Sequence, residues 1–275
     1  LATLIMTLLV FVPGLGFTHG GAQRWISIGP VSFQPAELLK IGFIIYFATW
    51  LAWTQKKNQD MKFKIVPLLI LLGVVAAILL KQPDTKSLIL ITASASGMLF
   101  VSGVSWKKIL AIFGIAVLGI GILALTRPYV MDRITTYLNP SSDPRGASYQ
   151  LQQSLIAIGS GGVFGRGLGQ SVQKFKYLPE PQGDSVFAVI GEEFGFFGSM
   201  ILVILYVFLG VRGYKIALRA PDAFGRYLVV GIITLLIAQS FLNIGSLVGL
   251  LPLTGVPLVF ISHGGTSLFI TLAAV

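Results

Sequence analysis

The chain has 275 residues, of which 55% are hydrophobic and only 11% are charged, whereas an ordinary soluble domain carries about 25% charged residues. So little charge cannot cover the surface of a water-soluble fold of this length, and the composition therefore predicts an integral membrane protein. The net charge of +10 is spread between apolar stretches, without the aromatic-interleaved basic patch of a nucleic-acid binder. Anionic and phosphorylated lipids are the expected partners instead. The absence of cysteine excludes disulfides and thiolate metal sites.

Eight apolar stretches are predicted to cross the membrane, because a helical span needs about 20 apolar residues. They cover 1–17, 37–54, 65–80, 87–106, 109–126 and 185–211, with two more inside 227–275. Pro252 and Pro257 separate the last two spans. Leu1 already lies inside an apolar run, so we expect the chain to begin within a span. Lipid admits only helices or closed barrels, so the predicted fold is an all-α, polytopic bundle that forms one domain over residues 1–275.

Basic residues in the short linkers predict the orientation of this bundle. The linkers after the second, fourth and sixth spans carry Lys56, Lys57, Lys62, Lys64, Lys107, Lys108, Arg212, Lys215, Arg219 and Arg226. These linkers fall on one side when the spans alternate, and that side is expected to be cytoplasmic. The opposite, extracytoplasmic side receives the segment 18–36, the turn 81–84 and the long loop 127–184.

The long loop mixes aromatic residues, glycines and paired charges, and loops of this length are usually functional or disordered. Leu151, Leu155 and Ile158 repeat at helical spacing, while Gln150 and Ser154 occupy other faces. This pattern predicts a helix that lies at the membrane interface or dips into it.

Most acidic residues fall on the outer side or in the outer ends of spans, namely Glu37, Asp84, Asp132, Asp143, Glu180, Asp184, Glu192 and Glu193. Glu37 and Lys40 share a helix face and form either a packing ion pair or part of the lining of a polar cavity. Glu192 and Glu193 lie among apolar residues, and a structural role is favoured for both, with one of them paired to a buried arginine or lysine.

Asp184 stands immediately before the sixth predicted span. It could cap that helix, since aspartate accepts hydrogen bonds from the first free backbone N–H groups. The same position keeps a carboxylate ionised and rigid at the membrane surface, which suits a general base. Its position alone leaves both roles open.

The outer loops also carry basic residues that could hold a pyrophosphate: Arg24, Arg127, Arg133, Arg145, Arg166, Lys174 and Lys176. The glycine-rich segment 159–169 lacks the Lys-Ser/Thr pair of a phosphate-binding P-loop. His19 and His263 are too isolated in the sequence to argue for a metal site, and none is predicted.

Four groups of residues in chain order resemble the signatures of one family. They are GAQRWI with FQPAELLK at 21–40, Gln82-Pro83-Asp84, the stretch 159–193, and LPLTGVP with ISHGG at 251–265. The chain is similar in these motifs to the SEDS family of shape, elongation, division and sporulation proteins (RodA, FtsW and SpoVE). It departs from the family at Thr85-Lys86-Ser87, where Leu-Gly-Thr is usual, at Pro181-Gln182-Gly183, where His-Thr is common, and at His263, where tyrosine is more usual. Residues 170–174 and 177–180 look more like FtsW than RodA.

The resemblance implies a ten-span fold, of which about the first two spans are absent here. It implies a peptidoglycan glycosyltransferase that polymerises lipid II, a disaccharide-peptide on undecaprenyl pyrophosphate, into β-1,4 glycan strands for cell division or cell shape. The family's essential carboxylate corresponds to Asp184. In this role Asp184 takes the proton from the acceptor sugar's 4-hydroxyl, which attacks the donor's anomeric carbon with inversion.

The leaving pyrophosphate needs cations, for which Arg24, Lys40, Arg133 and Arg145 are the candidates. Trp25 is expected to stack on sugar or lipid, or to anchor the chain at the interface. The expected set of substrate-binding residues is completed by Glu37, Asp84, Gln150, Ser154 and Lys174. A divalent cation, Mg²⁺ or Mn²⁺, is left open, because no ligand set is readable.

The resemblance further implies a bacterial cytoplasmic membrane protein whose active site faces outward. It implies a cognate class B penicillin-binding protein, a transpeptidase, as partner, together with other proteins of the division or elongation complex. Two alternatives stay open: a lipid II flippase, and a non-catalytic membrane scaffold of the cell-wall synthesis complex.

Overall fold

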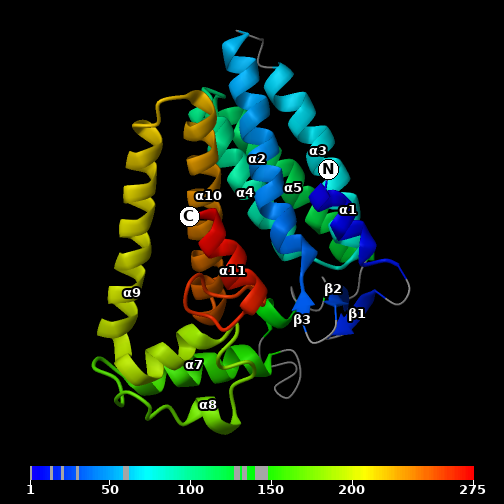
Figure 1. Cartoon of the computed structure of the whole chain (residues 1–275). Coiled ribbons are helices and arrows are strands. Elements are labelled where there is room, and N and C mark those ends of the chain that lie inside the picture. The colour runs from blue at the N-terminus through cyan, green and yellow to red at the C-terminus, as the bar shows by residue number, and fades with distance from the viewer. Residues whose placement is uncertain are drawn as a thin grey trace. The chain divides into compact units, whose positions relative to one another are not determined.

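The computed structural model describes residues 2–12, 15–19, 22–28, 31–57, 62–126, 131, 135–139 and 148–275. The described chain consists mainly of helices, with one small sheet (Figure 1). It divides into two compact units. Unit 1 comprises Leu1–Ile109, Gly210–Ala238 and Gly265–Val275, and unit 2 comprises Leu110–Leu209 and Gln239–Gly264.

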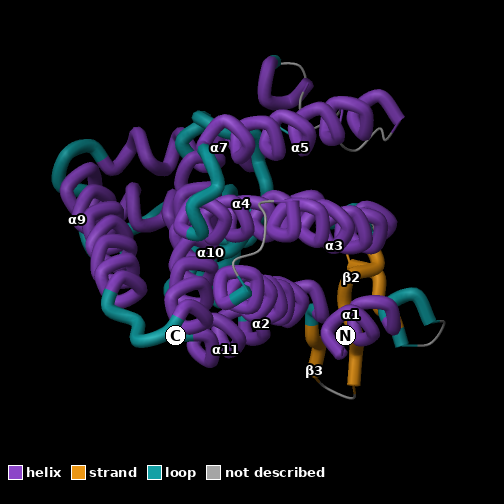
Figure 2. The backbone as a smooth tube through the Cα atoms, turned by 90° about the horizontal axis from the view of Figure 1, so that it is seen from above, coloured by secondary structure: helices purple, strands orange, loops and turns teal. Residues whose placement is uncertain are grey.

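Helices account for most of the backbone, as the tube in Figure 2 shows. They are α1 (Ala2–Leu9), α2 (Pro35–Lys56), α3 (Lys62–Lys81), α4 (Thr85–Val101), α5 (Trp106–Thr126), α7 (Tyr149–Gly161), α8 (Gln173–Lys176), α9 (Val186–Leu218), α10 (Ala223–Leu247) and α11 (Gly265–Ala274). The strands are β1 (Gly16–His19), β2 (Ala22–Ile28) and β3 (Val31–Phe33).

Within the described residues, four helices are long and apolar enough to cross a membrane: α2, α3, α9 and α10. The shorter α4 and α11 are also apolar. These helices coincide with predicted spans, and α10 and α11 are separated by the stretch that contains Pro252 and Pro257. The predicted all-α membrane fold is confirmed.

The first predicted span is wrong in its second half. Helix α1 ends at Leu9, and Gly16 already begins an antiparallel sheet in the order β1-β2-β3, with Gly16 opposite Ile26 and Ile26 opposite Phe33. A hydropathy profile counts apolar residues and contains no information about which backbone N–H and C=O groups will pair. The aromatic and β-branched residues of this region favour strands, and the sheet satisfies their backbone hydrogen bonds.

Helix α2 forms the centre of unit 1. Leu39, Phe43, Phe47 and Leu51 recur every four residues and are each at most 3% exposed. They form one face of α2, which packs against α1, α3 and α4 in this unit. This packing fixes the first turns of α2, where Glu37 and Lys40 lie, beside the sheet and the start of α4.

The helix predicted in the long loop is α7. Its buried face consists of Leu151, Ser154, Ala157 and Gly161, whereas Leu155, which the pattern grouped with Leu151, is 43% exposed. The small residues on this face let the backbone of α7 approach the first turns of α9, so closely that a Cβ at Gly161 would collide with the Gly191 carbonyl. Figure 1 shows α7 lying alongside this part of α9.

Helix α9 is broken at Gly195, whose backbone (φ 67°, ψ −161°) is not helical. The segment 162–167 pairs with the break: Arg166 N–H donates to Glu192 O (3.0 Å), and Phe196 N–H donates to Gly162 O (2.9 Å). The predicted sixth span, 185–211, is therefore corrected. The residues of α9 before Gly195 lie against α7. The stretch from 196 to Leu218 alone still has about the 20 residues that a span requires.

Candidate active site

The Asp184 carboxylate lies at the entrance to α9 in unit 2. Gln150 of α7 donates from Nε2 to Asp184 Oδ1 (3.2 Å) and to the hydroxyl of Ser185 (3.0 Å), and the Ser185 hydroxyl donates to the same Oδ1 (3.4 Å). Asp184 is partly exposed, whereas Ser185 is fully buried. The carboxylate is thus oriented from α7 and remains accessible, as a base must be.

The turn at Gly255 contacts the other oxygen of this carboxylate. Gly255 has φ +60°, and a Cβ placed on it would lie 3.2 Å from Asp184 Oδ2. A side chain here would therefore strain the backbone and crowd the carboxylate at the same time. The loop between α10 and α11 forms one wall of the candidate site.

The backbone that leads to Asp184 is held by this loop and by α10. The Ser262 hydroxyl donates to Gly183 O (2.5 Å) and accepts from Leu258 N–H (2.7 Å). Asn243 Nδ2 donates to the carbonyl of Asp184 (2.6 Å). These bonds fix the candidate base to two separate parts of the chain.

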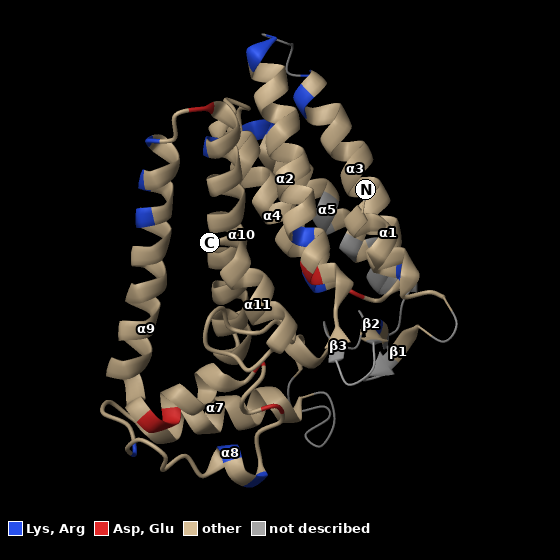
Figure 3. Ribbon diagram, in the orientation of Figure 1, with Lys and Arg blue, Asp and Glu red and all other residues tan. Residues whose placement is uncertain are grey.

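A second polar cluster lies in unit 1 at the sheet end of α2. Glu37 and Lys40 form a salt bridge (2.9 Å), and both side chains are almost completely buried. Asp84 is 1% exposed and caps α4 by accepting from Ser87 N–H (3.3 Å) and the Ser87 hydroxyl (2.7 Å). Figure 3 shows charges of both signs at the β3 end of α2, and basic residues at the far ends of α2 and α3.

Arg24 of β2 spans from the sheet to the α3–α4 turn. It donates from Nε to Gln82 O (3.1 Å) and from Nη2 to Pro83 O (2.6 Å). Lys86 in the first turn of α4 interacts electrostatically with Asp84, and also with Arg24, Glu37 and Lys40. The cluster therefore combines one arginine and two lysines with two carboxylic acid side chains.

The remaining predicted residues lie in different surroundings. Trp25 follows Arg24 on β2 and is partly buried. Ser154 is completely buried and donates to Gln150 O (2.7 Å), so it supports the turn that carries Gln150. Arg133 and Arg145 lie outside the described residues.

Glu192 and Glu193 attach the segment after α7 to α9. Glu192 is completely buried; it accepts from the Ser171 hydroxyl (2.6 Å) and from the backbone N–H groups of Val172 (3.1 Å) and Gln173 (3.2 Å). Arg166 lies 3.5 Å from Glu192, and Lys174 lies 2.6 Å from Glu193. Both glutamates make the structural contacts that were predicted, but their cationic partners are not buried, since the side chains of Arg166 and Lys174 are 42% and 24% exposed. Lys174, a predicted substrate ligand, is the ion-pair partner of Glu193.

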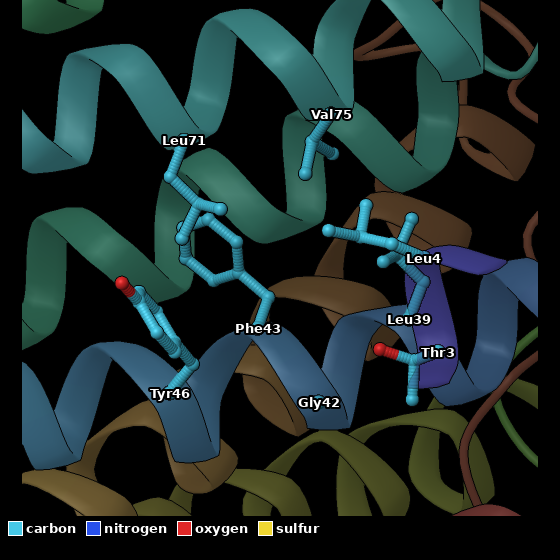
Figure 4. A pocket seen from close by; sticks show the side chains of 8 residues that line it. All are labelled: Thr3, Leu4, Leu39, Gly42, Phe43, Tyr46, Leu71 and Val75. Atoms are coloured by element: carbon cyan, nitrogen blue, oxygen red, sulfur yellow. The ribbon is translucent and has the colours of Figure 1, made fainter. Parts of the chain in front are cut away.

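Of two cavities, only the first includes a lysine and a histidine in its lining. In unit 2, a cavity of about 450 Å³ lies beside the segment before Asp184 and includes Lys174, Gln182 and His263 in its lining. In unit 1, a cavity of about 240 Å³ lies among α1, α2 and α3, where Phe43 and Tyr46 lie near Leu71 (Figure 4). The second cavity is lined mainly by apolar side chains and suits a hydrocarbon chain better than a phosphate or a sugar.

No group of three histidine or acidic side chains in the described part of the chain could hold a metal ion. Asp184 and the two carboxylates of unit 1 are engaged by amide, hydroxyl or ammonium groups. The residues seen here thus do not form a ligand set of the kind that Mg²⁺ or Mn²⁺ requires.

Three functional candidates were not predicted from the sequence. Lys86 follows Asp84 by two residues, so its place in the cluster could have been read from the turn that they share. Asn243 belongs to a polar stripe with Gln239 and Ser246 at helical spacing in an otherwise apolar run, which is itself a signal for function in a membrane span. Ser262 has no such signal, because its contact is made across 79 residues.

Comparison with known proteins identifies the family of this chain. The family model described as "Cell cycle protein", which covers FtsW, RodA and SpoVE, matches residues 1–275. The chain belongs to this family. It is 42% identical over 270 residues to "Stage V sporulation protein E" of Bacillus subtilis (strain 168), covering 98% of this chain and 74% of that protein.

Another member of the FtsW/RodA/SpoVE family, "Probable peptidoglycan glycosyltransferase FtsW" of Geobacter sp. (strain M18), is 42% identical over 275 residues, covering 100% of this chain and 75% of that protein. Among solved structures, a chain from "Structural coordination of polymerization and crosslinking by a peptidoglycan synthase complex" has a TM-score of 0.81 and 29% identity, covering 99% of this chain and 76% of that one. The Thermus thermophilus rod shape determining protein RodA has a TM-score of 0.70 and 29% identity, covering 99% and 72%. The predicted family is confirmed.

Proposed function

We propose that the chain is a peptidoglycan glycosyltransferase that polymerises lipid II into β-1,4 glycan strands and releases undecaprenyl pyrophosphate. The family and the activity named for its FtsW relatives support the reaction class. The observation that carries the proposal is the Asp184 carboxylate, which is partly exposed and is oriented by Gln150 and Ser185. An oriented, accessible carboxylate is what a glycosyl transfer to a hydroxyl acceptor requires.

Asp184 serves as the general base. It accepts the proton of the acceptor sugar's 4-hydroxyl while that oxygen forms a bond to the anomeric carbon of the donor. The bond from this carbon to the pyrophosphate oxygen breaks, and the leaving group takes the electron pair. Inversion follows, because attack and departure occur on opposite faces of the donor sugar.

The negative charge that develops on the pyrophosphate requires cations nearby. Of the candidates predicted from the sequence, Arg24 and Lys40 are described; both belong to unit 1, and the charge of Lys40 is offset by Glu37 at 2.9 Å. Arg133 and Arg145 remain candidates from the sequence alone. No described group of carboxylate and histidine side chains forms a ligand set for a divalent cation, and no step is assigned to one here.

The same proposal includes the setting of the enzyme. The protein spans the bacterial cytoplasmic membrane several times, with Asp184 on the outer face. A class B penicillin-binding protein crosslinks the strands that it makes, which agrees with the polymerisation and crosslinking named for the related synthase complex. The 42% identity to FtsW and SpoVE proteins favours a role in division or sporulation over elongation.

The flippase and scaffold alternatives are separated by two measurements. Purified protein in detergent, supplied with lipid II, should produce glycan polymer; a flippase would bind lipid II and leave it monomeric. Asp184→Ala in cells should abolish the function of the enzyme at normal protein levels, whereas a scaffold would retain its function. A protein that binds lipid II yet makes no polymer would contradict the proposed function.

A further inference from the structure

Three consecutive carbonyls ahead of α9 each accept one hydrogen bond from the 243–263 part of unit 2. His263 N–H donates to Gln182 O (2.7 Å), the Ser262 hydroxyl to Gly183 O (2.5 Å), and Asn243 Nδ2 to Asp184 O (2.6 Å). The residue that carries the carboxylate is thus held by a side chain, and that side chain comes from a long helix, α10.

Asn243 makes a second bond of the same kind. Its Nδ2 also donates to Val256 O (2.6 Å), so both amide hydrogens are used and the side chain has one orientation. Val256 follows Gly255, the residue that lies against Asp184 Oδ2. Asn243 therefore ties the backbone of Asp184 to the turn that borders its carboxylate, and so sets the spacing between them.

Asn243 is buried, and burying an amide side chain is costly unless its polar atoms are hydrogen-bonded. The side chain is 1% exposed, and its Oδ1 is buried without a hydrogen-bond partner among the described residues. Leaving a buried amide oxygen unpaired is unfavourable, so an amide chosen only for packing would be a poor choice here. The two hydrogen bonds that Asn243 donates, to Asp184 O and Val256 O, are therefore the reason for an amide at this position.

We propose that Asn243 is a positioning residue for the transfer reaction: it fixes Asp184 relative to the Gly255 turn, so that the carboxylate meets the acceptor hydroxyl in a productive geometry. This inference rests on the proposed function of Asp184 as the base. It assigns no contact with the substrate to Asn243, whose side chain is buried. A displaced base still permits binding and slows the chemical step.

Gln239 provides a matched control. It lies one turn before Asn243 on α10, is 2% exposed, and donates from Nε2 to Pro257 O (3.1 Å), the residue after Val256. Gln239→Ala therefore weakens the attachment of the same loop to the same helix. Asn243→Ala weakens this attachment and also removes the bond to Asp184 O.

The experiment compares wild type, Asn243→Ala, Gln239→Ala and Asp184→Ala in polymerisation of lipid II, with lipid II binding stoichiometry and thermal stability measured on the same samples. We expect Asn243→Ala to lower kcat about 10- to 100-fold, with KM and stoichiometry within about twofold of wild type. Gln239→Ala should keep kcat within about threefold even where it lowers the melting temperature to a similar extent. A loss of fold would reduce the binding stoichiometry instead.

Several results would overturn the inference. One is a wild-type kcat for Asn243→Ala, and another is an equal loss of kcat in Gln239→Ala, which would show that anchoring of the loop is all that matters. If Asn243→Ala fails to bind lipid II at full stoichiometry, Asn243→Leu decides, since it keeps a similar volume and has no donor; the same loss of kcat is expected, and a wild-type kcat refutes the role. Activity in Asp184→Ala would instead refute the proposed function.

Discussion

Gln150 is the residue through which α7 acts on the candidate base. Its amide donates to Asp184 Oδ1 (3.2 Å) from a partly exposed position, so its removal should disturb the carboxylate more than the fold. We predict that Gln150→Ala lowers kcat for lipid II polymerisation about 10- to 150-fold, since a hydrogen bond to a charged group contributes about 1.5–3 kcal/mol. The melting temperature should change little. An unchanged kcat would show that the base does not depend on this contact.

Gly255 tests the other side of the carboxylate. Gly255→Ala forces a side chain onto a backbone with φ +60° and places a Cβ 3.2 Å from Asp184 Oδ2. We predict a loss of about 1–3 kcal/mol in stability together with a clear loss of polymerisation. Gly103→Ala is the control, because Gly103 has φ +84° with open space around it. It should lose stability and keep its activity; equal activity losses in both variants would contradict the role of the contact.

Among the single residues of the candidate site, only some could be predicted from the sequence. Asp184 and Gln150 were predicted because they lie near the outer end of a span and in a polar loop, where position alone indicates function. Asn243 and Lys86 were missed for physical reasons. Asn243 acts across 59 residues through a backbone carbonyl, and Lys86 through a cluster of charges from several elements. The turn shared with Asp84 and the polar stripe on α10 mark the two residues as unusual, but neither local pattern identifies the distant groups that they contact.

At the scale of elements, Glu192 is the main attachment of the 165–177 segment to α9. Glu192→Gln replaces one acceptor oxygen by an NH₂ group among donors that include the Ser171 hydroxyl and Gln173 N–H. We predict a loss of about 2 kcal/mol in stability and faster tryptic cleavage after Lys174 and Lys176. Glu180→Gln, an exposed position before Asp184, should change neither. Wild-type cleavage of the Glu192 variant would contradict the attachment.

The elements themselves were predicted unevenly. Hydropathy located the long helices, because a run of about 20 apolar residues in lipid satisfies its backbone hydrogen bonds most readily as a helix. It could not locate the break at Gly195, since the backbone groups that the break frees are satisfied by residues 162–167, about 30 positions earlier. The same limit explains the β-sheet after α1, whose pairing is a property of three segments together.

At the scale of the whole molecule, the distribution of basic residues predicts which end of the bundle faces the cytoplasm. The chain has no cysteine, so single cysteines can report topology without background. We predict that Glu180→Cys reacts with an impermeant maleimide in intact spheroplasts, whereas Lys57→Cys reacts only after permeabilisation. Both positions are exposed, so access depends on the side of the membrane. The reverse pattern would invert the proposed orientation and place Asp184 inside.

The proposed function depends most on Asp184 as the base of a polymerising enzyme. The direct measurement is glycan synthesis from lipid II by purified wild type and by Asp184→Asn, with lipid II binding and thermal stability recorded for both. We predict polymer from wild type, and from Asp184→Asn a rate lower by about a thousandfold, with binding and fold intact. Polymer made by Asp184→Asn at the wild-type rate would contradict the account. A collapse of thermal stability would instead assign Asp184 to capping α9.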